Sequence, residues 1–163
     1  MSCCNNCGGY YNLNSINNGI GVSGPQGPQG PAGAPAISVA AEFIAPAATN
    51  EDLVLTAFTS YPGTQTSIVL NSTNNNVELT GGTYLIRYGT VATNTGATLP
   101  TISLTFNGVV YPITTRTGAA NATNTLSGDL LITVLPGTTV GLETTNSAEI
   151  TYTNSYLIIE KLS

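Results

Sequence analysis

The residues best suited to chemistry are three cysteines near the start of the chain. Cys3, Cys4 and Cys7 are the only cysteines in the sequence. A zinc site needs four ligands, and only Cys4 and Cys7 have the Cys-x-x-Cys spacing. A thioredoxin-like redox centre needs a βαβ context that this tail lacks. We expect disulfides between chains, because an odd number of thiols cannot pair completely within one chain. Thiols left unreacted in a flexible tail are the alternative.

The rest of the sequence offers no catalytic group. It has no histidine, its basic residues are Arg87, Arg116 and Lys161, and its eight carboxylates are dispersed. General acid–base catalysis needs two titratable groups held close together with separated pKa values. The one adjacent acidic pair, Glu51 and Asp52, is interpreted as a solvated turn. The sequence therefore predicts no catalytic, cofactor-binding or metal-binding residues, and a protein that is not an enzyme.

Glycine recurs at every third position early in the chain, at Gly21, Gly24, Gly27, Gly30 and Gly33. Prolines occupy positions between or after them: Pro25, Pro28, Pro31 and Pro35. Three polyproline II chains can wind together only if every third residue lacks a side chain, so this period predicts a collagen triple helix of three chains. A Pro/Gly-rich linker with chance spacing is the alternative. At ~3.1 Å per residue the segment spans roughly 45 Å, which is too short to hold a trimer alone.

The composition divides the chain into three parts: a tail at 1–20, a collagen-like stalk at 21–35 and a folded head at 36–163. No charged residue precedes Glu42, and the head has the usual size of one domain. The end of the tail and the start of the stalk carry a few apolar residues among asparagines. An uncharged segment of this kind could add a strand to a partner's sheet edge, or it could be a spacer. These possible docking residues are Leu13, Ile16, Ile20 and Val22.

Short alternating apolar runs separated by turn residues predict an all-β head with antiparallel strands in a sandwich or jelly roll. Asn107-Gly108 is the clearest hairpin turn, because a type I′ turn needs positive φ at both central residues. No stretch shows helical periodicity over three turns. Strands are expected at 37–45, 53–59, 67–70, 77–79, 82–92, 101–106, 109–115, 125–135, 139–144 and 149–160.

The charge and hydropathy of the chain exclude some partners. A net charge of −5 argues against nucleic acid and anionic membrane surfaces. No run approaches the ~18 apolar residues needed to span a bilayer. The N-terminus lacks the basic and apolar regions of a secretory signal peptide, so we expect no export by that route.

Three stretches carry a resemblance to known families. VELTGGTYLIRYGTVATNT, at residues 77–95, resembles the Gly-x-Tyr strand of the trimeric jelly-roll heads in the tumour necrosis factor (TNF) and complement collagen-stalk families. ISLTFNGVVYP, at 102–112, and SYLIIEKLS, at 155–163, are similar to the C-terminal domain of the BclA-type collagen-like glycoproteins of bacterial exosporium.

The resemblance implies a homotrimeric jelly-roll head that nucleates and caps the collagen stalk. It also implies a structural protein of the spore surface, in the exosporium or an appendage, that forms a fibre tip or short spike. The N-terminal tail would anchor it to other spore-surface or fibre subunits. A trimeric head that binds a ligand or receptor, or a phage tail-fibre tip, is the alternative. The tyrosines in the expected strands are assigned to the core or a trimer interface: Tyr84, Tyr88, Tyr111, Tyr152 and Tyr156.

Overall fold

The computed structural model describes residues 39–61 and 66–163. The chain divides into two units, residues 1–35 and 36–163, and all the described strands belong to the second. The three cysteines, the period-three glycines and the possible docking residues 13–22 lie outside the described residues, so those interpretations remain predictions.

The described head is built from strands, as the sequence predicts, with one short 3-10 helix. In chain order the elements are β1 (Val39–Ala45), β2 (Ala48–Thr49), β3 (Thr56–Tyr61), β4 (Ile68–Asn71), β5 (Asn76–Leu79), β6 (Gly82–Asn94), β7 (Thr101–Phe106), β8 (Val109–Val110), η1 (Pro112–Thr114), β9 (Arg116–Thr117), β10 (Thr123–Val134), β11 (Thr138–Thr144) and β12 (Ile150–Lys161).

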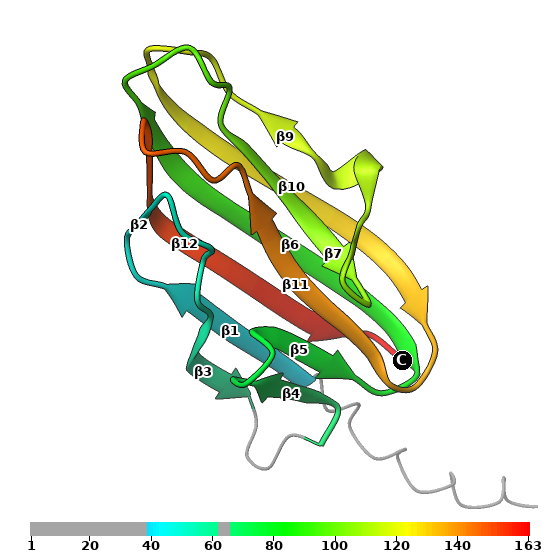
Figure 1. The fold of residues 1–163 in the computed structure, drawn as a ribbon. Helices are drawn as coiled ribbons and strands as arrows, with labels where there is room; N and C mark the ends of the chain where they lie inside the picture. The colour runs from blue at the N-terminus through cyan, green and yellow to red at the C-terminus, as the bar shows by residue number, and fades with distance from the viewer. Residues whose placement is uncertain (1–38, 62–65) are drawn as a thin grey trace, which may run out of the picture. The chain divides into compact units, whose positions relative to one another are not determined.

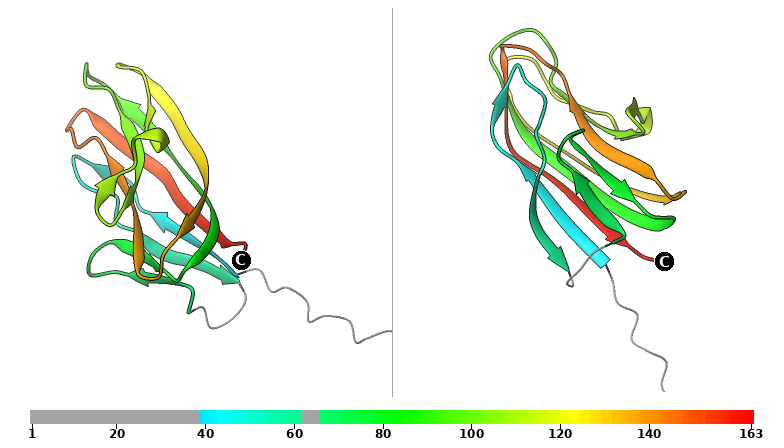
Figure 2. Two further views of the ribbon diagram at one scale, coloured as in Figure 1. Left: turned by 90° about the vertical axis from the view of Figure 1, so that its right-hand side faces the viewer. Right: turned by 60° about the horizontal axis from the view of Figure 1, so that its bottom comes forward.

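The strands form two antiparallel sheets that pack face to face (Figures 1 and 2). Sheet A has the order β10-β6-β12-β1-β3, and β2 adds to β12. Sheet B has the order β4-β5-β11-β7-β8, and β9 adds to β7. Neighbours in each sheet are often distant in sequence, as in a jelly roll. The described head is therefore the antiparallel jelly-roll sandwich that the sequence predicts.

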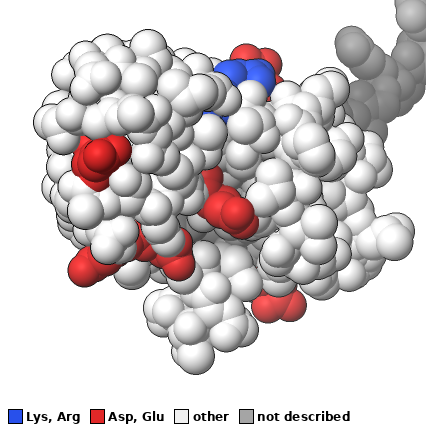
Figure 3. Space-filling view, turned by 45° about the horizontal axis from the view of Figure 1, so that its top comes forward, with Lys and Arg blue, Asp and Glu red and all other residues white. Residues whose placement is uncertain are grey.

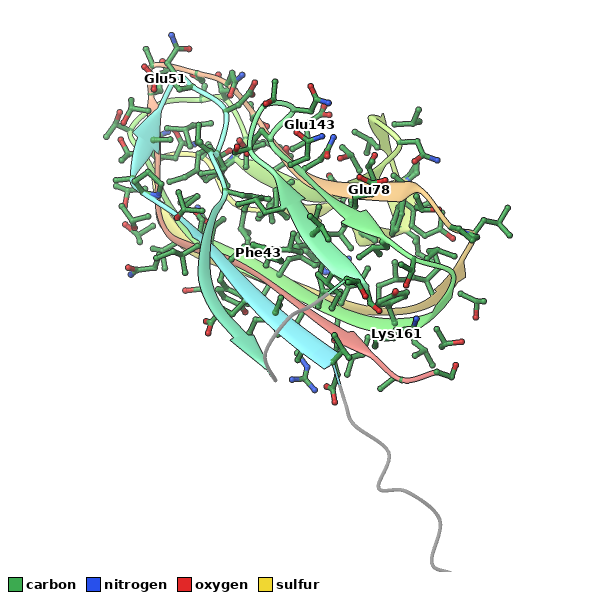
Figure 4. The ribbon with its side chains drawn as sticks, turned by 90° about the horizontal axis from the view of Figure 1, so that it is seen from below. Phe43, Glu51, Glu78, Glu143 and Lys161 are labelled. Atoms are coloured by element: carbon green, nitrogen blue, oxygen red, sulfur yellow. The ribbon has the colours of Figure 1, made fainter. Side chains whose placement is uncertain are left out.

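Alternation along the long strands of sheet A builds the core. Tyr84, Ile86 and Tyr88 of β6 point inward and are fully buried, as are Leu157 and Ile159 of β12. The residues between them face the other side of the sheet, because side chains alternate along a strand. Sheet B supplies Val77, Leu79, Ile102, Leu104 and Val140 to the same core. Phe43 of β1 lies among the side chains between the two sheets (Figure 4).

A β-bulge interrupts β12 near its middle. The register with β6 shifts between Thr153 and Tyr156, and Asn154 has a φ of 52°. A bulge adds an unpaired residue to one strand and bends it. The alternation therefore resumes with Ser155 buried and Tyr156 on the outer side of sheet A.

Two expected strands differ from the structure. The strand expected at 109–115 stops at Val110, because Pro112 lacks a backbone N–H and instead begins η1. Leu53 and Leu55 are buried, but the chain joins a sheet ladder only at Thr56. The Asn107-Gly108 turn is confirmed, with φ values of 51° and 76°. Within the described residues, no helix is long and apolar enough to cross a membrane.

Candidate functional site

The outer side of sheet A is the most distinctive surface of the described head. It is formed by the residues of β1, β6, β10 and β12 that alternate with the core residues, and we call it the A face. Across its middle, Ser127, Gly89, Tyr156 and Ile44 stand side by side on four neighbouring strands. The sequence signals that position these side chains are the alternation of β6 and β12 and the bulge at Asn154.

Gly89 and Tyr156 interlock at the centre of the A face. A Cβ atom placed on Gly89 would lie 2.7–2.8 Å from three atoms of the Tyr156 side chain. The ring therefore lies directly over the glycine, where any larger residue would displace it. Tyr156 is half-buried by this contact, unlike the core tyrosines Tyr84, Tyr88 and Tyr152.

Exposed apolar side chains lie among charged ones in the half of the A face toward the start of β1 and the end of β12, and we call it the apolar half. Leu131 of β10 is 63% exposed and stands opposite Leu85 of β6, and Leu135, just after β10, is 78% exposed. Ile158 of β12 stands between Arg87 and Glu42, and Ile44 of β1 stands beside Tyr156. Large apolar side chains that are exposed close together, with polar and charged residues around them, are typical of a binding interface.

The opposite half of the A face is a hydroxyl surface. Thr123, Thr93, Thr151 and Thr49 form one row across β10, β6, β12 and β2. The hydroxyls of Thr49 and Thr151 are 2.8 Å apart, and those of Thr93 and Thr123 are 3.4 Å apart. Paired threonines across strands stabilise a sheet without an apolar partner. The apolar half is thus the part of this face that gains most from being covered.

The A face carries three acidic residues, Glu42, Asp129 and Glu160, and one basic residue, Arg87. Arg87 of β6 stands opposite Asp129 on β10 and opposite Ile158 on β12, and Glu42 of β1 follows Ile158 in the same row. In Figure 3 the basic atoms form one group, whereas the acidic side chains are scattered over the surface in view. Such a mixture favours a protein partner of complementary charge over a polyanion.

Two hollows flank Tyr156 on the A face. The first is lined by Leu85, Arg87, Ser127, Gly128 and Asp129 with Tyr156, and has a volume of about 360 Å³. The second, which we call the bulge hollow, has a volume of about 520 Å³. It is lined by Ile44, Ala45, Pro46, Ala47, Thr153, Asn154, Ser155 and Tyr156. The β-bulge of β12 therefore forms one wall of an apolar depression beside an aromatic ring.

A second exposed apolar patch lies where β8 passes into η1. Val109 is 70% exposed and Ile113 is 71% exposed, and Tyr111 between them is also exposed. We call residues 109–114 the corner. The Tyr111 ring meets the Phe106 ring edge-on, with centroids 5.5 Å apart. Thr114, which is buried, fixes the end of the corner because its Oγ1 accepts from Leu104 N at 3.0 Å and donates to Tyr111 O at 2.6 Å.

The corner is held against the free edge of β10. Arg116 Nε donates to Ser127 O at 3.2 Å, and Arg116 Nη1 donates to Ile113 O at 3.2 Å. The Tyr88 hydroxyl donates to Thr114 O from inside the sandwich. Burial raises the pKa of Tyr88, so the hydroxyl stays a donor at neutral pH. Val109 and Ile113 are thus exposed on a segment that hydrogen bonds hold against β10.

The outer side of sheet B carries a polar hollow of about 460 Å³. Asp52, Asn76 and Glu143 are among its lining residues, and Asn146 Nδ2 donates to Asp52 Oδ1 at 2.8 Å. Glu51 and Asp52 are both exposed, as a solvated turn requires. Glu51, Glu78 and Glu143 lie apart from one another (Figure 4). Within residues 39–61 and 66–163, no three His, Cys, Asp or Glu side chains group as a metal site.

The structure divides the five strand tyrosines between the core and the surface, and a place in a trimer interface stays a prediction for the two at the surface. Tyr84, Tyr88 and Tyr152 belong to the core, Tyr111 lies on the exposed corner and Tyr156 lies at the centre of the A face. Sequence reasoning missed the A face and its hollows. The signal that could have found them is Gly89 in the middle of a strand, because an isolated strand glycine marks a close approach by another group.

Comparison with known proteins identifies the fold. No family model matches the sequence, and no curated protein matches it either. Eiger TNF from S. frugiperda matches with a TM-score of 0.55 and 12% identity, over 78% of this chain and 94% of that chain. Murine APRIL at pH 5.0 matches with a TM-score of 0.53 and 11% identity, over 77% of this chain and 99% of that chain. Murine APRIL at pH 8.5 matches with a TM-score of 0.50 and the same identity and coverage.

These likenesses define the class of fold. The head is a jelly roll of the TNF type, which confirms the fold that the Gly-x-Tyr strand resemblance implied. At 11–12% identity the likeness carries the fold alone. What the head assembles with and binds must be argued from its own surface.

Proposed function

We propose that this chain forms a homotrimer through the A face and serves as the head of a short collagen-stalked surface protein. The observation that carries the proposal is the apolar half of the A face, which is exposed in a single chain. Burial of apolar area is the main favourable term in association. The TNF-type fold and the period-three glycines, which predict three chains, support the same stoichiometry.

The proposed biological role is structural. The resemblance of residues 102–112 and 155–163 to exosporium glycoproteins supports a place on the bacterial spore surface, as a fibre tip or short spike anchored by the tail. A trimeric head that binds a ligand or receptor is the second candidate, and the polar hollow on sheet B is the feature that favours it. Labelling intact spores with antibodies against the head tests the first role, since absence from the surface would contradict it.

Light scattering of the full chain tests the assembly. We expect a particle of three chains at micromolar concentration, and a monomer would overturn the proposal. Ile158→Arg should dissociate the trimer, because it replaces an apolar side chain with a long charged one, between Arg87 and Glu42, on a face that assembly would bury. Val69→Arg is the matched control, since Val69 is an exposed residue of β4 in sheet B. Circular dichroism should show the same β content in both variants.

A further inference from the structure

The polar hollow of about 460 Å³ on the outer side of sheet B lies where that sheet is incomplete. β11 pairs with β7 as far as Thr144, whereas its pairing with the shorter β5 ends at Val140 (Figure 1). Residues 141–144 therefore have a strand partner on one side only, and all four line the hollow. An unpaired strand edge presents main-chain N–H and C=O groups to a molecule that lies beside it.

The main chain of Leu142 and Thr144 points toward the side that β5 leaves open. Thr145 N, just after β11, donates to Thr101 O of β7, so the odd-numbered residues of this segment bond to β7. Residues along an antiparallel strand bond alternately to the strands on its two sides. Within the described residues, nothing bonds to the main chain of Leu142 or Thr144 on the open side.

Two buried side-chain oxygens in the wall of the hollow also lack a hydrogen-bond partner among the described residues. They are Asn76 Oδ1 and Thr144 Oγ1, and Thr144 is only 8% exposed. An unpaired buried polar atom costs free energy, so a bound molecule is one of the few explanations for it. No other buried side-chain nitrogen or oxygen in the described part of the chain is unpaired, so both such atoms belong to this hollow. Rotation of either side chain can turn its oxygen toward a ligand, because both residues already line the hollow.

The groups around the hollow define the chemistry of its ligand. Asp52 and Glu143 contribute two carboxylates, and no lysine or arginine lines the hollow, which disfavours an anion. The carboxylates accept hydrogen bonds, whereas the main chain of Leu142 and Thr144 both donates and accepts them. A sugar hydroxyl has one donor hydrogen and two acceptor lone pairs, so it can pair with both kinds of group. We infer that the hollow binds a neutral saccharide.

Two other classes of ligand fit this lining less well. A calcium ion takes about six to eight oxygen ligands and cannot use the main-chain N–H groups. In addition, no three acidic side chains of the described residues group together. An extended peptide would pair with the edge of β11, but its main chain would leave the carboxylates of Asp52 and Glu143 without donors. The volume of the hollow lies within the range of small-molecule sites, about 300–1,000 Å³.

The inference rests on the second candidate function, the ligand-binding head, and names its class of ligand. It does not depend on the proposed trimer contact. The hollow lies on the outer side of sheet B, whereas the A face is the outer side of sheet A. Covering the A face would therefore leave the hollow open.

Saturation-transfer NMR of the full chain tests the inference with the neutral methyl glycosides of glucose, galactose, mannose, rhamnose and N-acetylglucosamine. We expect at least one glycoside to bind saturably, and Glu143→Gln to weaken that binding at least tenfold. Glu78→Gln is the matched control and should bind as the unaltered protein does, since Glu78 is an exposed glutamate of sheet B outside the lining. Absence of binding by all five glycosides, or equal binding by the two glutamine variants, would overturn the inference. Binding of calcium chloride or of an uncharged serine-containing tetrapeptide, without any glycoside, would overturn it as well.

Thr144→Val provides a second measurement, because it replaces an unpaired buried hydroxyl with a methyl group of similar size. We expect the urea midpoint to stay unchanged or to rise, and glycoside binding to weaken at least tenfold. A lower midpoint would mean that the hydroxyl is paired in the folded protein, and unchanged binding would mean that the ligand does not reach it. Either result contradicts the inference. A trimer by light scattering that binds no glycoside leaves the proposed assembly standing, whereas a monomer that binds one overturns the assembly alone.

Discussion

Asparagine does in this head what glycine does in most turns. All five described non-glycine residues with positive φ are asparagines: Asn50, Asn75, Asn107, Asn121 and Asn154. Asparagine tolerates the left-handed region because its short polar side chain can bond locally to the backbone. Asparagine is therefore a structural residue in the turns of the described head.

Asn75 shows how such a residue also replaces a missing strand contact. Its Nδ2 donates to Leu53 O at 2.6 Å, and its Oδ1 accepts from Leu55 N at 2.7 Å. We predict that Asn75→Ala destabilises the protein by about 1–3 kcal/mol, because it removes both hydrogen bonds at a positive φ. Urea unfolding at one chain concentration measures this loss. Asn74→Ala, at an exposed neighbour, should change stability by less than about 0.5 kcal/mol; equal losses would contradict the prediction.

Substitutions at two glycines on opposite sides of sheet A should affect different properties, the stability of the protomer and the assembly of the trimer. A methyl group on Gly128 would lie 2.7 Å from Tyr88 Cζ on the core side, whereas one on Gly89 would meet the Tyr156 ring on the A face. We predict that Gly128→Ala costs about 1–3 kcal/mol of protomer stability through overpacking. Gly89→Ala should move Tyr156 and weaken the trimer while the protomer stays folded. Unfolding and light scattering together distinguish these effects, and the prediction fails if the two variants behave alike.

The sequence predicts a strand well where apolar and polar residues alternate over many positions. It predicts a strand poorly where a single residue determines whether the chain joins a sheet. The strand expected at 101–106 is found with those bounds, and the 82–92 strand extends to Asn94. By contrast, β2 and β9 have two residues each, which is too short for any periodic signal. The chain at 53–55 has the pattern of a strand, yet the Asn75 side chain takes the place of a ladder partner. A side chain from a distant position that takes the place of a strand partner leaves no pattern in the local sequence.

Tyr152 joins the two sheets and makes stability depend on pH. Its hydroxyl lies on β12 of sheet A and donates to Thr101 O and Thr145 O, at 3.1 and 3.2 Å, at the end of sheet B. Burial raises the pKa of Tyr152 above its ordinary value of 10.0. The folded state then holds this proton more tightly than the unfolded state. The corresponding stability is complete below pH 10 and is lost as the pH rises toward the higher folded pKa.

We predict that stability falls above about pH 10, and that Tyr152→Phe makes the fall shallower because the titrating group is gone. At neutral pH the same variant should lose about 1 kcal/mol for the missing hydrogen bonds. Urea midpoints measured across this pH range provide the test. Val69→Ala, at an exposed residue of β4 that has no titratable group, should retain the slope of the unaltered protein. An unchanged slope in Tyr152→Phe would contradict the assignment.

At the scale of the molecule, the sequence predicts the number of chains but not the surface through which they would assemble. Period-three glycines predict three chains through steric necessity at a common axis. The A face could have been suspected from four consecutive apolar residues, Tyr156 to Ile159, because a strand apolar on both sides is covered on both sides. The two hollows and the corner could not, since they depend on a bulge, a proline and a buried threonine from separate elements.

The cysteines belong to this scale too, because in the sequence they precede both the collagen-like segment and the head. We predict that Cys3, Cys4 and Cys7 form disulfides between trimers or with an anchoring protein. A trimer would carry nine of these thiols, and an odd number cannot pair completely within it. The head contains no cysteine, so head-to-tail disulfides between copies cannot form. Covalent attachment must therefore be made at the tail, in an oxidising surface compartment.

Electrophoresis of protein taken from its native surface tests this prediction. Without reductant we expect species larger than one chain that collapse to a single chain when reductant is added. Changing all three cysteines to serine should release the protein from the surface and leave a trimer by light scattering, because the proposed trimer contact lies in the head, which contains no cysteine. If the serine variant stays attached and runs identically without reductant, the disulfide anchor is wrong. The protein would then be attached to the surface by the segment that contains Leu13, Ile16, Ile20 and Val22, which would pair with the edge of a partner's sheet.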